Sequence, residues 1–399
     1  MLTFTIFICF FIFVLSLICS KYNIFSPSVI TSGIWLIIMI LNIIIPNNLY
    51  PLSSNFLIPI NIWISLFCFF SLLIQSLTFS SGSSIQPSQF ARNLFYYISL
   101  LTFPFLLFKA YEIIQLGSVS NWMGQLRIVA TGGSKLIDQQ ETSPFYIIIW
   151  LVSYLIELYY FSEKNKKRVY VLFLMYFAYA LISMSKTNFL SLFLSTVLIL
   201  YFKNIFKIKH IFIFLIALFV FFQGFQSFRS QGKNIPNQTT KFVTLYLLSS
   251  PVAFEKITDN STQQWGENTF RTFYAIKYKL GFSDIKPVDQ ILPFIYIPIS
   301  TNTYTILYPF FIDFGIAGVI FFSIFFGLLL GFIFKKSQES SIIFIIIYSF
   351  ILPQIVMQFA GEMIITNLSL NLKRILIVML PFIITKYNLF SKNQNKVLG

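Results

Sequence analysis

The feature that most constrains this chain is a series of long, uninterrupted apolar runs. Val319–Phe334 and Ile211–Phe222, for example, contain no charged residue. A helix needs roughly 20 predominantly apolar residues to cross the hydrocarbon core of a bilayer. Hydrophobic residues make up 57% of the chain and charged residues only 10%, which leaves too little polar surface for a water-soluble protein. Because the runs are continuous and do not alternate, they predict membrane-spanning helices and not the strands of a barrel.

The runs predict an all-α polytopic membrane protein with about eleven transmembrane helices. The whole chain, 1–399, is predicted to form a single integral membrane domain. The predicted helices lie near 2–20, 28–45, 56–79, 94–115, 145–162, 169–184, 188–202, 211–228, 305–334, 341–360 and 372–386. The first run lacks the basic region of a signal peptide, so we interpret it as a membrane helix and not as a removed leader.

Short basic loops predict how the chain is oriented in the membrane. Three of them, at 163–168, 203–210 and 335–340, are rich in Lys, and short loops of this kind stay on the cytoplasmic side. The N-terminus is then predicted to be periplasmic and the C-terminus cytoplasmic. This bias places half of the 28 Lys and Arg residues on the inner face. We therefore attribute the net charge of +15 mainly to the enrichment of Lys and Arg in cytoplasmic loops. No nucleic-acid partner is expected.

Two polar loops are predicted on the periplasmic face, a smaller one at 116–143 and a large one at 229–303. The large loop is expected to hold short helices at 237–249 and 269–280, the second of them capped by Gly281. Trp and Tyr residues are frequent in it, and these side chains favour the membrane–water boundary. We therefore expect the large loop to lie against the membrane surface.

Some positive charges on the predicted outer face need an explanation. Lys186, Lys373 and Arg374 lie at or near the ends of predicted helices, where a charge at membrane depth is costly. An anionic ligand would offset this cost. A carboxylate partner, or snorkelling of the side chain to the headgroups, would offset it as well, and both alternatives stay open.

Several common kinds of site are missing from the sequence. There is no P-loop, no glycine-rich dinucleotide motif, no zinc-ligand spacing and no Asp-x-Asp pair. The single histidine, His210, falls on the predicted cytoplasmic side, which excludes a Ser–His–acid triad on the outer face. The three cysteines lie in apolar runs, so no disulfide framework is expected. We expect neither a metal nor a soluble cofactor.

The charged residues that remain on the outer face fit a phosphate-bearing substrate. The planar fork of Arg binds two phosphate oxygens at once, and a pyrophosphate leaving group needs charge stabilisation more than a proton donor. One carboxylate would then act as the base on an attacking hydroxyl. The candidate substrate-binding residues are Arg127, Lys186, Arg229, Lys233, Arg271, Lys277 and Arg374, and the candidate bases are Asp313, Glu362, Glu255 and Glu141. Asp313 also has a structural alternative, as a carboxylate favoured by the dipole at a helix N-terminus.

Four parts of the chain carry a resemblance to a known family. Residues 24–40 begin a helix with Pro and contain Trp35, and residues 182–190 hold a small–small–basic turn with Lys186. Residues 228–233, followed by 246–256, form the third part. The most specific part is 300–331, with an Asn-x-Tyr-Thr turn and then Asp-Phe-Gly at the start of a Gly-rich helix. In these parts the chain resembles the oligosaccharide repeat-unit polymerases of bacterial envelopes, the O-antigen polymerase (Wzy-type) family.

This resemblance implies a GT-C-like glycosyltransferase of the bacterial inner membrane that makes O-antigen or capsular polysaccharide. In the implied reaction, a sugar hydroxyl of a lipid-linked acceptor attacks the anomeric carbon of a lipid-linked donor on the periplasmic face. Configuration is inverted, undecaprenyl pyrophosphate leaves, and no metal takes part. The implied partners are both lipid-linked oligosaccharides, the membrane and a protein that regulates chain length. The resemblance implies that the pyrophosphate is bound by Arg127, Lys186, Arg229 and Arg271. It also implies that the site is formed by Asn302, Tyr304 and Asp313.

Three other functions are alternatives to this one. An O-antigen ligase is related in chemistry, but such ligases carry a periplasmic His, which this chain lacks. A flippase or transporter of lipid-linked glycans should show charged residues in mid-helix lining a cavity. Only Glu157 fits that description, and its side chain could instead snorkel toward Lys164. A sensor or scaffold would carry a recognisable soluble domain, and the sequence shows none.

Overall fold

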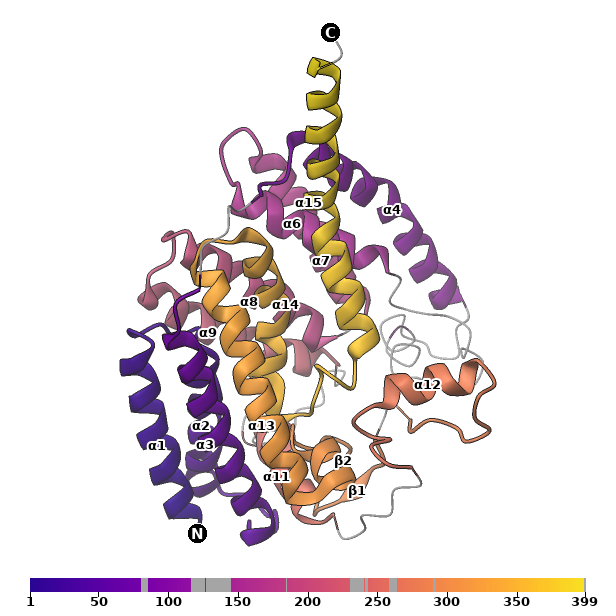
Figure 1. Ribbon diagram of the computed structural model, residues 1–399. Helices are drawn as coiled ribbons and strands as arrows, with labels where there is room; N and C mark the ends of the chain where they lie inside the picture. The colour runs from indigo at the N-terminus through magenta and orange to yellow at the C-terminus, as the bar shows by residue number, and fades with distance from the viewer. Residues whose placement is uncertain are drawn as a thin grey trace. The chain divides into compact units, whose positions relative to one another are not determined.

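The computed structural model describes residues 1–79, 85–115, 126, 145–183, 185–229, 240, 243–257, 264–289 and 292–397. This part of the chain is almost entirely helical (Figure 1). All eleven predicted apolar stretches are helices, so their existence is confirmed, with most ends within about five residues of the prediction. They are α1 (Leu2–Cys19), α2 (Pro27–Ile44), α3 (Ser54–Ser76), α4 (Gln89–Gln115), α6 (Tyr146–Tyr159), α7 (Lys166–Ile182), α8 (Lys186–Phe202), α9 (Ile208–Arg229), α13 (Tyr308–Gln338), α14 (Ile342–Val356), which continues into the 3₁₀ turn η3 (Met357–Phe359), and α15 (Leu368–Val397).

Within the described residues, seven helices are long and apolar enough to cross a membrane, by length and composition. They are α1 to α4, α13, α14 with η3, and the part of α15 that ends at Tyr387. Apolar helices that are shorter include α6, α8 and the segment Ile208–Gly224 of α9. The chain is thus a multi-pass membrane protein, while eleven crossings and the orientation stay predictions.

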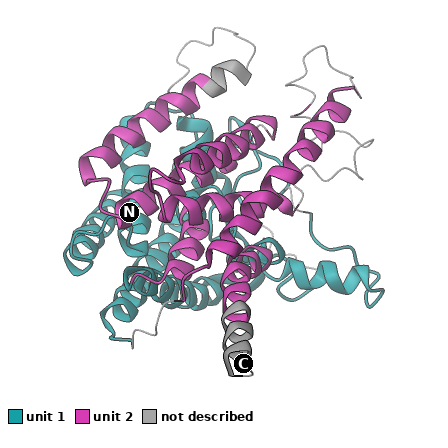
Figure 2. Cartoon of the chain, turned by 90° about the horizontal axis from the view of Figure 1, so that it is seen from above, with its two compact units in different colours: residues 1–81, 234–339, 354–371 teal, residues 82–233, 340–353, 372–399 magenta. Residues whose placement is uncertain are grey.

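The chain divides into two compact units (Figure 2). Unit 1 consists of Met1–Ser81, Asn234–Glu339 and Gln354–Asn371, and unit 2 of Gly82–Lys233, Ser340–Pro353 and Leu372–Gly399. Each unit is built from stretches far apart in the sequence, so neither corresponds to a segment that the sequence could have marked.

Close contact between α3 and α13 forms the spine of unit 1. Gly327 and Gly331 share one face of α13, four residues apart. A Cβ built at Gly327 would lie 2.6 Å from the carbonyl oxygen of Phe67, and one built at Gly331 would lie 2.7 Å from that of Ser71. Only glycine at these positions lets the two backbones approach so closely, which is the usual way that helices associate in membranes.

Helix α13 is broken at Gly315, near its start. Gly315 has φ 61° and ψ −147°, a conformation that residues with a Cβ rarely adopt. The short piece before the break folds back, and Phe310 stacks on Phe322 of the longer piece with ring centroids 4.2 Å apart. The Asp-Phe-Gly motif is therefore a helix break and not the start of a continuous helix.

The remaining elements of unit 1 come from the large loop. They are the π-helix η2 (Thr244–Leu248), α11 (Ser249–Glu255), α12 (Arg271–Lys279), β1 (Ile295–Tyr296) and β2 (Ser300–Thr301). The two strands pair antiparallel, with Ile295 opposite Thr301. Within the described residues, the sheet structure consists of this small hairpin. Of the predicted helix at 237–249, residues 237–239 and 241–242 lie outside the described residues, and 244–248 form the π-helix η2. The predicted helix at 269–280 is present as α12, and its predicted cap at Gly281 is confirmed. Gly281 has φ 76°, and the N–H of Phe282 bonds to the carbonyl of Lys277 at 2.9 Å, as in a Schellman cap.

Unit 2 contains α4, α6 to α9, most of α14 and most of α15. Helix α6 lies at its centre, because eleven of its fourteen residues are buried. Trp150 and Tyr154 are among the largest fully buried side chains. The hydroxyl of Thr102 accepts from the indole N–H of Trp150 at 2.7 Å, so the polar atom of this buried ring is satisfied.

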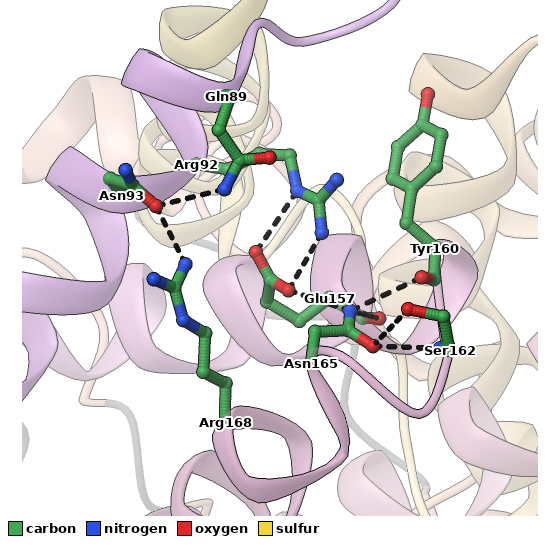
Figure 3. A network of polar contacts seen from close by, with 8 residues as sticks. All are labelled: Gln89, Arg92, Asn93, Glu157, Tyr160, Ser162, Asn165 and Arg168. Atoms are coloured by element: carbon green, nitrogen blue, oxygen red, sulfur yellow. Dashed lines mark hydrogen bonds and ion pairs between the residues drawn. The ribbon is translucent and has the colours of Figure 1, made fainter.

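A buried ion pair at the end of α6 holds three segments of unit 2 together (Figure 3). Glu157, 1% exposed, accepts from Arg92 of α4 in a bidentate pair at 2.8 and 3.0 Å. The amide of Asn165, just before α7, donates to the same carboxylate at 2.8 Å. The sequence-based suggestion that Glu157 reaches Lys164 is therefore wrong. Arg92 lies close enough to form the pair because α4 packs against α6, a contact between residues 65 positions apart.

Candidate functional site

A cavity of about 410 Å³ lies in unit 1, at the first turn of α13, and most of the residues that line it are polar. Its walls come from α12 and the segments on either side of it, from the loop between β2 and α13 with the first turn of α13, and from the loop between η3 and α15. The lining residues are Asn268, Arg271, Val288, Asp289, Leu292, Asn302, Thr303, Tyr304, Thr305, Tyr308, Pro309, Ala360, Gly361, Glu362, Met363, Thr366 and Asn367. Amides, hydroxyls and aromatic rings dominate this lining, with one guanidinium and two carboxylates among them.

Buried hydrogen bonds to Gln358 anchor one side of the cavity to α2. Its Oε1 accepts from the indole N–H of Trp35 at 3.0 Å, and its Nε2 donates to the hydroxyl of Thr31 at 3.2 Å. Its backbone carbonyl accepts from the N–H of Ile306 at 2.8 Å. Gln358 thereby ties α2, η3 and the loop before α13 together, which fixes the positions of Tyr304 and the 360–367 loop.

Asp313 anchors a second side of the cavity. One carboxylate oxygen accepts from the backbone N–H and the amide of Asn268, at 3.3 and 2.8 Å, and the other accepts from the N–H of Thr269 at 2.7 Å. The hydroxyl of Thr269 also donates to the carbonyl of Pro309 at 3.2 Å. These bonds hold the start of α12 against the first turns of α13, so Arg271 comes to the cavity wall.

Glu362 organises the third side. Its carboxylate accepts from the N–H groups of Ile364, Ile365 and Thr366, at 2.6, 2.9 and 2.7 Å. Burial raises the pKa of the Glu362 carboxyl, and these backbone donors oppose that shift without cancelling it. The residue therefore shapes the loop from Gly361 to Asn367.

Among the described residues that line this cavity, Arg271 is the only cation. Its Nε donates to the carbonyl of Val288 at 2.6 Å. Among the described residues, no carboxylate lies within ion-pair distance of its guanidinium. Burial lowers the pKa of Arg271, and the charge of nearby Asp289 acts in the opposite direction. A half-buried guanidinium with a single carbonyl partner is well suited to bind an anion.

Two tyrosines form an aromatic wall beside Arg271. The rings of Tyr304 and Tyr308 lie 4.6 Å apart. The hydroxyl of Tyr304 donates to the carbonyl of Pro293 at 3.0 Å, and burial raises the pKa of this hydroxyl. Tyr308 is more accessible than Tyr304 and lines the same cavity.

The structure brings together four of the residues selected from the sequence. Arg271, Asn302, Tyr304 and Glu362 line one cavity, and Asp313 reaches it through its bonds to Asn268. None of the other predicted residues that the structure describes lines this cavity. Lys277 lies exposed on α12, and Lys186 and Arg374 belong to unit 2. Arg127, Lys233 and Glu141 lie outside the described residues, as does the side chain of Arg229.

Glu255 lies at a second cavity of unit 1, also of about 410 Å³, lined by residues of α3, α11 and α13. Its carboxylate accepts from the N–H groups of Ser53 and Phe56, at 3.2 and 3.1 Å, and from the hydroxyl of Ser53. Glu255 therefore caps the N-terminus of α3, where the helix dipole favours a negative charge.

Among the polar residues of the first cavity that sequence reasoning missed are Asn268, Asp289, Tyr308 and Asn367. Tyr308 follows Tyr304 by four residues, so the motif at 300–331 could have pointed to it. No local pattern marks the other three, because they enter the cavity only when separate loops pack together.

The sequence also matches the model of a known protein family. The family model described as "Putative O-antigen polymerase" matches residues 2–359. The chain therefore belongs to the O-antigen polymerase family. No curated protein and no solved structure matches the chain.

Proposed function

We propose that this protein joins lipid-linked oligosaccharide repeat units into a polysaccharide such as O-antigen or capsule. A terminal hydroxyl of the acceptor attacks the anomeric carbon of the donor, the bond to the pyrophosphate oxygen breaks, and undecaprenyl pyrophosphate leaves. Membership of the O-antigen polymerase family supports the reaction class. The observation that carries the assignment of the site is Arg271, a half-buried guanidinium in a cavity of amides, hydroxyls and aromatic rings.

In this proposal Arg271 binds the pyrophosphate of the donor. Charge builds up on the leaving oxygen in the transition state, and a preorganised donor in a partly dry site stabilises it strongly. Asn302 and Tyr308 line the same cavity and would contact the sugar, since amides bond to sugar hydroxyls and aromatic rings pack against apolar sugar faces. Lys186 and Arg374 in unit 2, and Lys277 on α12, stay predictions as substrate-binding residues.

We also propose that the cavity faces the periplasm. It lies at the first turn of α13, whereas Lys336 lies in the last turn of this helix. The Lys336 ammonium packs over the ring of Phe79, which follows α3. The start of α2 lies at this same end, because Ser26 donates to Gln75 at 3.1 Å, so the turn that contains Lys21 lies there too. Lysines therefore cluster at the end of unit 1 that lies away from the cavity. Because Lys-rich loops stay on the cytoplasmic side, the cavity at the opposite end of α13 would face the periplasm.

The test measures the distribution of polysaccharide chain lengths, seen as a ladder on a gel. The polysaccharide comes from a strain that lacks the native gene and carries a variant. Arg271→Ala should leave single repeat units and no long polymer, while Arg271→Lys should restore part of the polymer, because Lys keeps the charge but not the planar fork. The matched control is Lys279→Ala, an exposed cation on the same helix, which should give a normal ladder. A normal ladder from Arg271→Ala, at equal amounts of protein in the membrane, would contradict the proposal.

A further inference from the structure

The carboxylates near the cavity differ in how many of their lone pairs are already used. Glu362 accepts three backbone hydrogen bonds, and Asp313 accepts three from Asn268 and Thr269. Each holds a loop in place, and the N–H donors already occupy lone pairs that a substrate hydroxyl would otherwise use. Asp289 lines the cavity but accepts no such bond from any described residue. Among the described residues, Asp289 forms an ion pair with Lys286 at 3.4 Å, and both side chains are about three-quarters exposed.

The position of Asp289 is nevertheless set by the site. Arg271 donates through Nε to the carbonyl of Val288, the preceding residue. This bond ties the segment that carries Asp289 to α12, and the Asp289 charge is close enough to act on the guanidinium of Arg271. A carboxylate with open lone pairs and the cation of the cavity are therefore held on the same wall.

We propose that Asp289 is the general base of the transfer reaction, a proposal that rests on the function proposed above. The acceptor hydroxyl bonds to the Asp289 carboxylate and attacks the anomeric carbon of the donor. A new carbon–oxygen bond forms as the bond between the anomeric carbon and the pyrophosphate oxygen breaks. The electron pair of that bond leaves with the lipid pyrophosphate, which Arg271 binds, and the hydroxyl proton passes to Asp289. No other reactant is needed for this step to balance.

The nearby Lys286 does not prevent this role. An exposed ion pair contributes roughly 0–1 kcal/mol and opens readily, so the Asp289 carboxylate can exchange Lys286 for a substrate hydroxyl. Removing the lysine should then leave the reaction largely intact, which separates a catalytic carboxylate from one that only forms a surface pair.

The experiment uses the purified full-length protein with a lipid-linked repeat unit and follows release of the prenyl pyrophosphate. Asp289→Asn should lower kcat by roughly 10²–10⁴, the usual range for loss of a general base, with little change in KM for the donor. The matched control is Asp284→Asn, an exposed carboxylate five residues earlier that does not line the cavity. Asp284→Asn and Lys286→Met should keep activity within about threefold, a small effect on the barrier.

A pH profile provides a second measurement that a structural role would not change. A protonated carboxylate cannot act as a base, so the acidic limb of the wild-type pH–rate profile should be missing from the residual rate of Asp289→Asn. The other titratable groups in the cavity are Arg271, Tyr304, Tyr308 and Glu362, and Lys286 lies beside Asp289, so the Asn variant isolates the contribution of Asp289.

The outcomes separate this inference from the proposed function. If Arg271→Ala destroys turnover but Asp289→Asn remains as active as wild type, the base assignment is wrong and the polymerase assignment stands. If Glu362→Gln loses activity while folded and Asp289→Asn does not, the base is Glu362. If the wild-type protein releases no prenyl pyrophosphate, the proposed function itself fails.

Discussion

The two units of this protein use arginine in opposite ways. In unit 2, the guanidinium of Arg92 forms a bidentate pair with buried Glu157 and packs over the ring of Tyr160 at 4.8 Å. In unit 1, Arg271 lines a cavity, and a single backbone carbonyl accepts from it. The first arginine has its charge neutralised by protein and holds helices together. The second keeps its charge available to a ligand, and the unit around it is held by close backbone packing of α3 on α13.

From this comparison, we expect the largest loss of stability when Arg92, the paired arginine, is replaced. Arg92→Met should lower the free energy of unfolding by about 3–5 kcal/mol, because it leaves the Glu157 carboxylate buried without its partner. Thermal unfolding of the purified protein in detergent measures this. The double variant Arg92→Met with Glu157→Leu should recover much of the loss, since neither charge is then buried. Lys166→Met, which removes an exposed pair with Glu163 at 3.6 Å, is the control and should change little. Equal losses from Arg92→Met and Lys166→Met would contradict the contrast between the units.

The next effect tests the packing of unit 1. Gly331→Ala should cost about 1–3 kcal/mol, because its Cβ would meet the backbone of Ser71 on α3 and force the helices apart. The control is Gly224→Ala on α9, where a Cβ would meet nothing within 4 Å. That change should be neutral or stabilising by up to about 1 kcal/mol, because Ala is the better helix former. If both glycine variants unfold at the same temperature, close packing of α3 on α13 does not hold unit 1.

A smaller effect concerns the loop that Glu362 organises. Glu362→Gln should cost about 1–2 kcal/mol, since an amide has one acceptor oxygen for three backbone donors. Its pH dependence has a defined sign. The folded-state pKa is raised above the ordinary 4.5, so the folded state binds the proton more tightly than the unfolded state does. The contribution of this group to stability is therefore full below pH 4.5 and declines as pH rises through the folded-state pKa. Unfolding scans across this range should show wild type losing stability relative to Glu362→Gln, and a difference that stays constant with pH would refute the assignment.

The smallest expected effect on stability belongs to the cavity arginine. Arg271→Met should change the free energy of unfolding by less than about 1 kcal/mol, because it breaks no ion pair and keeps an apolar stem of similar length. The same variant should make no long polymer. A protein that keeps its stability and loses its product has a functional cation at this position. A loss of several kcal/mol would instead show that Arg271 supports the fold, as Arg92 does.

Part of the site could be predicted from the sequence. One contiguous stretch with a recognisable motif contains Asn302, Tyr304 and Asp313. Arg271 could be selected because it is a cation in a predicted periplasmic loop, where the enrichment of Lys and Arg in cytoplasmic loops does not account for it. The role of Asp313 could not be read in advance, because its partners Asn268 and Thr269 lie more than 40 residues away. For the same reason, nothing in the sequence distinguished Asp289 from Asp284.

The sequence by itself determined where the helices are, because a continuous apolar run and a capping glycine act over a few residues and need no distant partner. It also determined membership of the family, which is carried by patterns along the chain. Only the tertiary structure decided which charges are paired and which remain available. Arg92 meets Glu157 across two helices, and the cavity of Arg271 is closed by loops about 100 residues apart. Such contacts depend on how helices pack, and helix packing is set by the combined fit of many side chains from separate parts of the chain.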